Sequence, residues 1–119
     1  MSRSQKQYLL DILEAMDDAR SFIEDVTKED LKDDRRTRYA LQRAFEIIGE
    51  ATKHLDRDLR TKYEDVPWDD MAGMRDMIVH EYFAVDLDIV WRTVRKDMPP
   101  VQQRLRNILE EHFDEGTAL

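Results

Sequence analysis

Three side chains capable of acid–base and anion-binding chemistry lie within eight residues of this 119-residue chain: Arg75, His80 and Tyr82. A histidine can move protons near neutral pH, an arginine can hold an anionic oxygen, and a phenol can donate a hydrogen bond. Together they could cleave a phosphodiester without a metal ion, with His80 as the acid–base group and Arg75 as the fixed cation. The segment 75–82 is therefore the first candidate for a catalytic site.

The spacing of these residues decides whether a single helix could bring them together. On an ideal helix Arg75 and His80 are about 140° apart, whereas Asp76 and His80 are neighbours one turn apart. If the segment is helical through His80, the Asp76 carboxylate can hydrogen-bond the imidazole and fix its tautomer. Arg75 can meet His80 only if the helix ends near there or a second subunit completes the site. The spacing therefore predicts a site at a helix end or a dimer interface.

The residue types alone leave a structural alternative open. Asp76 and His80 could form an ordinary surface pair worth about 0.2–0.5 kcal/mol. Tyr82 and the adjacent Phe83 could simply pack this segment against the rest of the fold.

The other candidates for a metal site are weaker. His54 and His112 lie in separate segments, without carboxylates at metal-ligand spacing. Glu46 and Glu50 are four residues apart but have no Glu-x-x-His partner, so we interpret them as a solvated face. The sequence predicts no metal site.

Charge limits the partners of the chain. The formal net charge of −8 argues against a general nucleic-acid binder, so any polyanion must meet a local basic patch. Two basic clusters could hold phosphates, although a solvated helix surface is the favoured interpretation for most of their members. These clusters are Arg35, Arg36, Arg38 and Arg43, and Arg92, Arg95 and Lys96.

The chain has no cysteine and no apolar run long enough for a signal peptide or a membrane span, so we expect a soluble cytoplasmic protein.

Apolar residues recur at three- and four-residue spacing throughout, which predicts one all-α domain over residues 1–119. We expect long helices over about 4–26 and 34–57, and short helical turns at 28–32 and before Tyr63. A third helix should begin at Pro67 and carry the motif. A fourth should begin after Asp86 and break at Met98, because Pro99 disfavours helical geometry there; a fifth follows over 101–113. Gly49, inside the second long helix, indicates a close helix–helix contact.

Beyond these local patterns, the chain resembles a known family over roughly residues 5–112. Residues 75–82 match the Arg-X4-His-X-Tyr motif of the HEPN superfamily, and further segments resemble its HepT-like branch in order and spacing. These segments are 45–51 (FEIIGEA), 66–68 (VPW), 72–75 (AGMR), 80–83 (HEYF) and 97–100 (DMPP).

The resemblance implies an up-and-down bundle of four to five helices that forms a homodimer, with two motif copies near the two-fold axis. It also implies a metal-independent endoribonuclease that needs no cofactor, the toxin of a type II or VII-like toxin–antitoxin pair. His80 would be the general acid and base, Arg75 would stabilise the phosphorane, Asp76 would orient the site, and Tyr82 would position RNA.

A partner is implied as well. HepT-like toxins are commonly encoded beside an MntA-type nucleotidyltransferase antitoxin, and some of these transfer AMP from ATP to the motif tyrosine, here Tyr82. The alternative is a non-catalytic helical dimer that serves as binding partner or AMP acceptor of a minimal nucleotidyltransferase.

Overall fold

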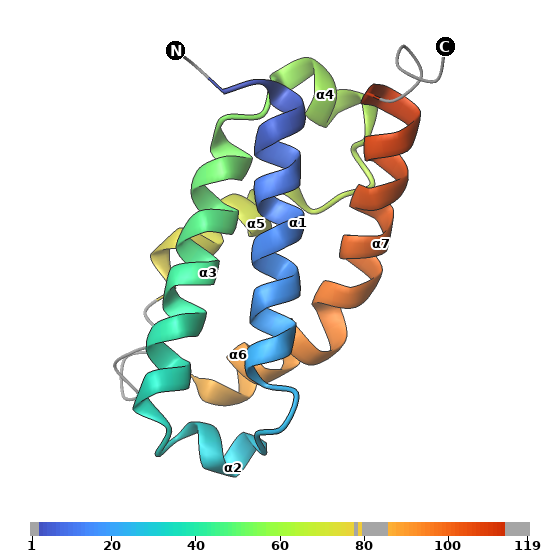
Figure 1. Cartoon of the computed structure of the whole chain (residues 1–119). Coiled ribbons are helices and arrows are strands. Elements are labelled where there is room, and N and C mark those ends of the chain that lie inside the picture. The colour runs from blue at the N-terminus through green and yellow to red at the C-terminus, as the bar shows by residue number, and fades with distance from the viewer. Residues whose placement is uncertain (1–2, 78, 80–85, 114–119) are drawn as a thin grey trace.

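The structure is a computed structural model that describes residues 3–77, 79 and 86–113. Every regular element within these ranges is helical, and together they form an up-and-down bundle (Figure 1), which confirms the predicted fold class. The elements are α1 Gln5–Phe22, α2 Lys28–Leu31, α3 Arg35–Lys53, α4 Arg57–Lys62, α5 Trp68–Gly73, the 3₁₀ turn η1 Met74–Asp76, α6 Leu87–Arg92, the π turn η2 Thr93–Asp97, α7 Met98–Ile108 and the π turn η3 Leu109–Phe113.

The bundle is organised around α1, which lies between α3 and α7 (Figure 1). α3 runs antiparallel to α1, and its other side packs against α5 and η1. The core is built from the apolar stripes that the sequence spacing predicts, and most of its largest fully buried side chains come from α1, α3 and α7. They include Leu9, Ile12, Met16, Leu41, Phe45, Ile48, Leu105 and Ile108. Across the described residues, no helix is both long enough and apolar enough to cross a membrane.

Capping side chains mark the start of several helices. The side chains of Thr27 and Asp34 accept the backbone N–H groups of Asp30 and Thr37, each at 3.0 Å. Asp86 begins α6 in the same way. Hydrogen bonds from the Thr37 backbone and hydroxyl lower the pKa of Asp34, so the capping carboxylate stays charged and stabilises the start of α3.

The two long helices end earlier than the apolar stripes predict. α1 ends at Phe22, and three-residue turns follow it. α3 ends at Lys53 instead of near residue 57, because Gln5 of α1 binds the chain there. The Gln5 amide donates to the His54 carbonyl at 3.0 Å and accepts from the Asp56 N–H at 2.6 Å. A contact distant in sequence therefore ends this helix.

The predicted helix break at the two prolines is wrong. Met98 is helical, with φ −67° and ψ −43°, and helical turns continue from α6 through Pro99 and Pro100 into α7. The π turn η2 makes this possible: the Met98 N–H reaches five residues back to the carbonyl of Thr93. Widening the turn before a proline relieves the clash between the proline ring and the carbonyl of the preceding turn. It also accommodates the N–H that proline lacks, so the helix is not interrupted.

Candidate functional site

The predicted third helix does not extend through the motif. α5 ends at Gly73, the 3₁₀ turn η1 carries Arg75 and Asp76, and Met77 is extended, with φ −78° and ψ 121°. The predicted relation between Asp76 and His80 required a helix through His80, and this condition is not met at Met77. The alternative prediction, a site at a helix end, needs the helix to stop near the motif, and η1 ends at Asp76.

α3 fixes the backbone of the motif at its first residue. A Cβ atom placed on Gly49 would lie 2.5 Å from the Arg75 backbone nitrogen, 2.7 Å from its Cβ and 2.9 Å from the Ala72 carbonyl oxygen. Only a glycine leaves room for this approach. The close contact expected at Gly49 is confirmed, and its partner is the arginine of the motif.

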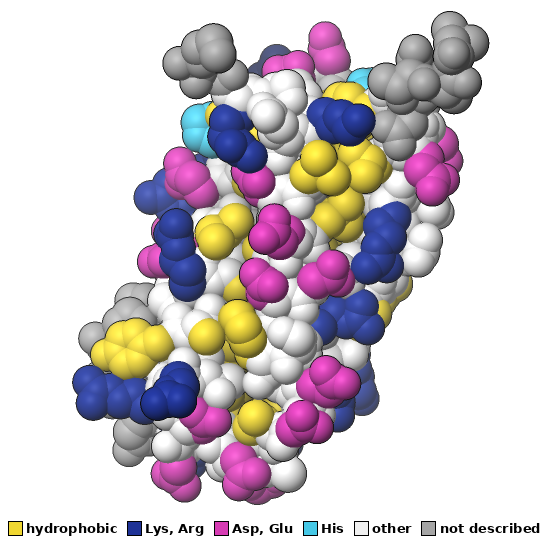
Figure 2. Space-filling model, viewed as in Figure 1, with side chains coloured by type: hydrophobic (Ala, Val, Ile, Leu, Met, Phe, Trp, Pro, Cys, Tyr) yellow, Lys and Arg dark blue, Asp and Glu magenta, His cyan; other side chains and the backbone are white. Residues whose placement is uncertain are grey.

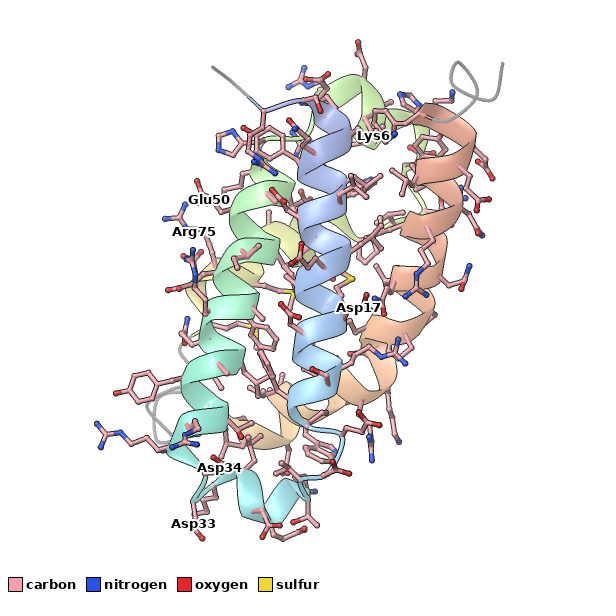
Figure 3. The ribbon with its side chains drawn as sticks, in the orientation of Figure 1. Lys6, Asp17, Asp33, Asp34, Glu50 and Arg75 are labelled. Carbon is pink, nitrogen blue, oxygen red and sulfur yellow. The ribbon has the colours of Figure 1, made fainter. Side chains whose placement is uncertain are left out.

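The Arg75 side chain reaches the surface beside α3. Its Nη1 donates to Glu50 Oε2 at 2.8 Å, and its Nε lies 3.8 Å from Asp76 Oδ1. Figure 3 shows Glu50 and Arg75 next to each other on the same side of the bundle. The Arg75 side chain is 43% exposed, so its guanidinium is held by Glu50 and is still accessible to solvent. This arrangement suits an arginine that must be oriented and still receive an anionic ligand.

Glu50 connects the arginine to a second pair of side chains. Its Oε1 lies 3.6 Å from His54 Nε2, and the His54 ring stacks on Tyr8 with centroids 4.8 Å apart. The sequence placed Glu50 on a solvated acidic face, and it is indeed exposed, but its pairing with Arg75 was missed. The four-residue spacing of Glu50 and His54 indicates only their own pairing, and no local pattern indicates the pairing of Glu50 with Arg75.

α3 also holds the motif segment near its middle. Gln42 is buried, and its side-chain oxygen accepts the backbone N–H of Val79 at 2.5 Å. Val79 is fully buried and directly precedes His80 in sequence. This bond replaces the backbone acceptor that a continuing helix would have supplied, so the buried N–H of Val79 is satisfied although the chain has left helical geometry. Gln42 was missed, although it is a polar residue seven positions before Gly49 on the buried side of α3.

Two of the four predicted site residues, His80 and Tyr82, lie outside the described residues. The structure brings the other two, Arg75 and Asp76, together in η1. Within the described part of the chain, no three His, Asp or Glu side chains gather where they could hold a metal ion. His54 pairs with Glu50, and Nδ1 of His112 lies 3.4 Å from the Tyr63 hydroxyl.

Comparison with known proteins identifies the family. A sequence model described as ribonuclease HepT-like matches residues 12–108. The chain belongs to the HepT-like family. The matched range contains α3, η1 and the complete motif, so the contacts that hold Arg75 all lie within the family region.

Individual HepT-like relatives match along almost their whole lengths. "Probable ribonuclease HepT" of Thermococcus cleftensis is 40% identical over 108 residues, which cover 91% of this chain and 98% of that protein. Two relatives named "Putative RNase" are 37% identical (Methanocaldococcus jannaschii; 87% of this chain, 94% of the relative) and 36% identical (Caldanaerobacter subterraneus; 92% and 97%). No solved structure matched the chain significantly.

Proposed function

We propose that this protein is a metal-independent endoribonuclease and the toxin of a toxin–antitoxin pair. The observation that carries the proposal is the setting of Arg75. Its backbone is wedged against Gly49, its guanidinium is oriented by Glu50, and almost half of the side chain remains exposed. Such an arginine can accept a phosphate without first being reorganised. The ribonuclease names of HepT-like relatives supply the substrate class.

The proposed reaction uses the ribose 2′-hydroxyl as the nucleophile. His80 accepts the proton of this hydroxyl as its oxygen attacks the adjacent phosphorus. Arg75 binds the non-bridging oxygens, whose negative charge grows in the phosphorane. The bond to the 5′-oxygen then breaks, and that oxygen takes a proton from the His80 imidazolium. The products are a 2′,3′-cyclic phosphate and a 5′-hydroxyl, so DNA is not cleaved.

Asp76 and Tyr82 assist this step. Asp76 lies 3.8 Å from Arg75 Nε on the side of the guanidinium away from Nη1, so it helps to orient the arginine. Tyr82 positions RNA through its phenol. Because η1 leads into an extended chain, the site does not need one helix face, and we propose that two motif copies of a homodimer complete it.

The same tyrosine is the proposed target of neutralisation. An MntA-type nucleotidyltransferase antitoxin would bring ATP, and the Tyr82 phenolic oxygen would attack its α-phosphorus. A bond forms from the phenolic oxygen to that phosphorus, pyrophosphate leaves, and the phenolic proton passes to solvent. The attached AMP would place an anion beside Arg75 and occupy the cation that the substrate phosphate needs.

A cleavage assay in EDTA tests the proposal. Wild type, His80→Ala and Arg75→Lys are purified without the partner and given an RNA oligonucleotide, and one sample has a 2′-deoxy residue at the cleavage site. We expect cleavage by wild type only, ending in a cyclic phosphate and blocked by the 2′-deoxy residue. Arg75→Lys keeps the charge but loses the planar fork, so cleavage should fall strongly. The control is Lys53→Ala, an exposed cation at the end of α3.

Intact-mass measurement on the same samples reveals any AMP on Tyr82, and Tyr82→Phe should abolish that modification. No cleavage by unmodified, dimeric wild type would refute the nuclease and leave a non-catalytic partner or AMP acceptor. Full activity of His80→Ala would refute the assigned acid–base group.

A further inference from the structure

The exposed face of α3 carries a basic and aromatic surface that the reaction above does not use. We call Arg35, Arg36, Tyr39 and Arg43 the α3 stripe. Arg35 and Arg36 lie four and three residues before Tyr39, Arg43 lies four residues after it, and all four are exposed. Figure 2 shows dark-blue basic side chains and a yellow hydrophobic one gathered over the N-terminal end of α3. Tyr39, 47% exposed, is one of few large hydrophobic side chains that reach the surface in the described residues.

The members of the α3 stripe are well placed to bind an anion. The Arg35 guanidinium lies 5.5 Å from the Tyr39 ring centroid and its Nη2 donates to the Tyr39 hydroxyl at 3.4 Å, so cation and ring form one unit. The Arg43 side chain is 72% exposed and meets Glu46 only at 3.8 Å. Arg38, by contrast, is buried and donates to the Leu31 and Lys32 carbonyls, so it belongs to the fold.

The α3 stripe continues directly from the candidate site. The motif chain touches α3 first at Gly49, through Arg75, and then at Gln42, through Val79. These contacts are seven residues apart, so the chain descends α3 by about 10 Å towards the N-terminus of the helix. Arg43 is the neighbour of Gln42 in sequence, and the α3 stripe extends from Arg43 over about two turns to Arg35, a length of about 12 Å.

We infer that the α3 stripe is a binding subsite for single-stranded RNA, with one base stacked on Tyr39 and neighbouring phosphates held by Arg35 and Arg43. The inference rests on the proposed ribonuclease function and extends it to nucleotides beside the cleaved bond. It also explains how a chain of net charge −8 can hold a polyanion: three exposed arginines lie on one helix face next to the motif. An aromatic ring between cations is the arrangement that binds unpaired bases without reading their sequence.

The test measures RNA affinity separately from cleavage. In a His80→Ala background, the dissociation constant for a single-stranded oligonucleotide is measured at several salt concentrations. Tyr39→Ala should weaken binding about tenfold, whereas Tyr39→Phe, which keeps the ring, should bind like the parent. Arg35→Ala with Arg43→Ala should lower the salt dependence by roughly 1.4, about 0.7 for each lost phosphate contact. Arg57→Ala with Lys62→Ala removes the same charge from exposed positions in α4 and is the matched control.

The oligomeric state of every variant is measured by light scattering. If wild type cleaves RNA but the α3 stripe variants bind like the control, the subsite is wrong and the proposed function stands. A change of oligomeric state without a change in the salt slope would assign the α3 stripe to a protein interface and overturn the inference. If wild type neither binds nor cleaves RNA, the proposed function and the subsite both fail.

Discussion

Glu50 offers the sharpest test of how the site is built, because it touches Arg75 but not the reacting atoms. Replacing Glu50 by alanine removes the 2.8 Å hydrogen bond that orients the guanidinium and leaves the wedged backbone at Gly49 unchanged. We therefore expect the variant to fold normally and to hold Arg75 in place by its main chain only. The orientation of the side chain should be lost.

The expected size of the effect differs between stability and catalysis. The side chains of Arg75 and Glu50 are 43% and 54% exposed, so solvent screens their attraction and the ion pair stabilises the fold by about 0.5 kcal/mol or less. A charge-assisted hydrogen bond that orients a catalytic cation matters more for the barrier. Losing it should raise the barrier by about 1–2 kcal/mol, which lowers the cleavage rate roughly five- to thirtyfold. RNA affinity should stay equal or increase, because a negative charge beside the phosphate is gone.

The assay compares single-turnover cleavage, RNA affinity and urea unfolding for three variants. Glu50→Gln keeps a hydrogen-bond acceptor and should retain more activity than Glu50→Ala. Glu46→Ala is the matched control. Glu46 lies one turn before Glu50 on α3, carries the same charge, and meets Arg43. Equal cleavage rates for Glu50→Ala and Glu46→Ala would refute a positioning role. A loss of RNA affinity that fully accounts for the lost cleavage would refute it as well.

Three further predictions concern how α3 supports the site. Gly49→Ala should destabilise the fold by about 1–3 kcal/mol and reduce cleavage. Gly73→Ala should be neutral or slightly stabilising, because its added Cβ would meet nothing within 4 Å. Urea unfolding of the two variants measures this difference in stability. Gln42→Ala leaves the buried backbone N–H of Val79 without its acceptor, so the free energy of unfolding should fall by about 1–3 kcal/mol. Cleavage should fall more than RNA affinity, and unchanged cleavage would contradict this role. Asp34→Ala should cost about 1 kcal/mol at neutral pH. Because the folded-state pKa of Asp34 is lowered, that difference should persist above pH 3.8 and disappear as the pH falls through the folded pKa; a constant difference in acid would contradict the capping role.

The parts of the fold that local chemistry controls could be predicted from the sequence. The caps at Thr27, Asp34 and Asp86 depend on side chains two or three residues from the N–H groups they satisfy. The stripes of apolar residues likewise indicate which faces are buried, so the all-α class follows from spacing. The helix ends were harder to predict from the sequence. Gln5 terminates α3 from 49 residues away, and the π turn η2 lets helical turns continue through Pro99.

The candidate site shows the same division. The types and spacing of Arg75 and Asp76 indicate anion chemistry, yet their geometry depends on partners in α3 that no local pattern reveals. Glu50 and Gln42 are polar residues whose roles appear only when the motif chain is placed beside them. A glycine inside a helix was the one long-range signal, since it costs about 1 kcal/mol and therefore needs a packing reason.

These contacts make α3, rather than the helix that carries the motif, the element that shapes the site. α5 and η1 supply Arg75, but α3 sets its backbone position through Gly49, its side-chain direction through Glu50 and the onward path of the chain through Gln42. Those residues occupy adjoining faces of one helix, so a rotation of α3 would move the arginine and the start of the segment that leads to His80 together. Cleavage should therefore be sensitive to substitutions at Gly49, Gln42 and Glu50, and at the first two of these stability should fall as well. The exposed Glu50 is the clearest case, because its removal costs the fold little and disturbs the orientation of the cation directly.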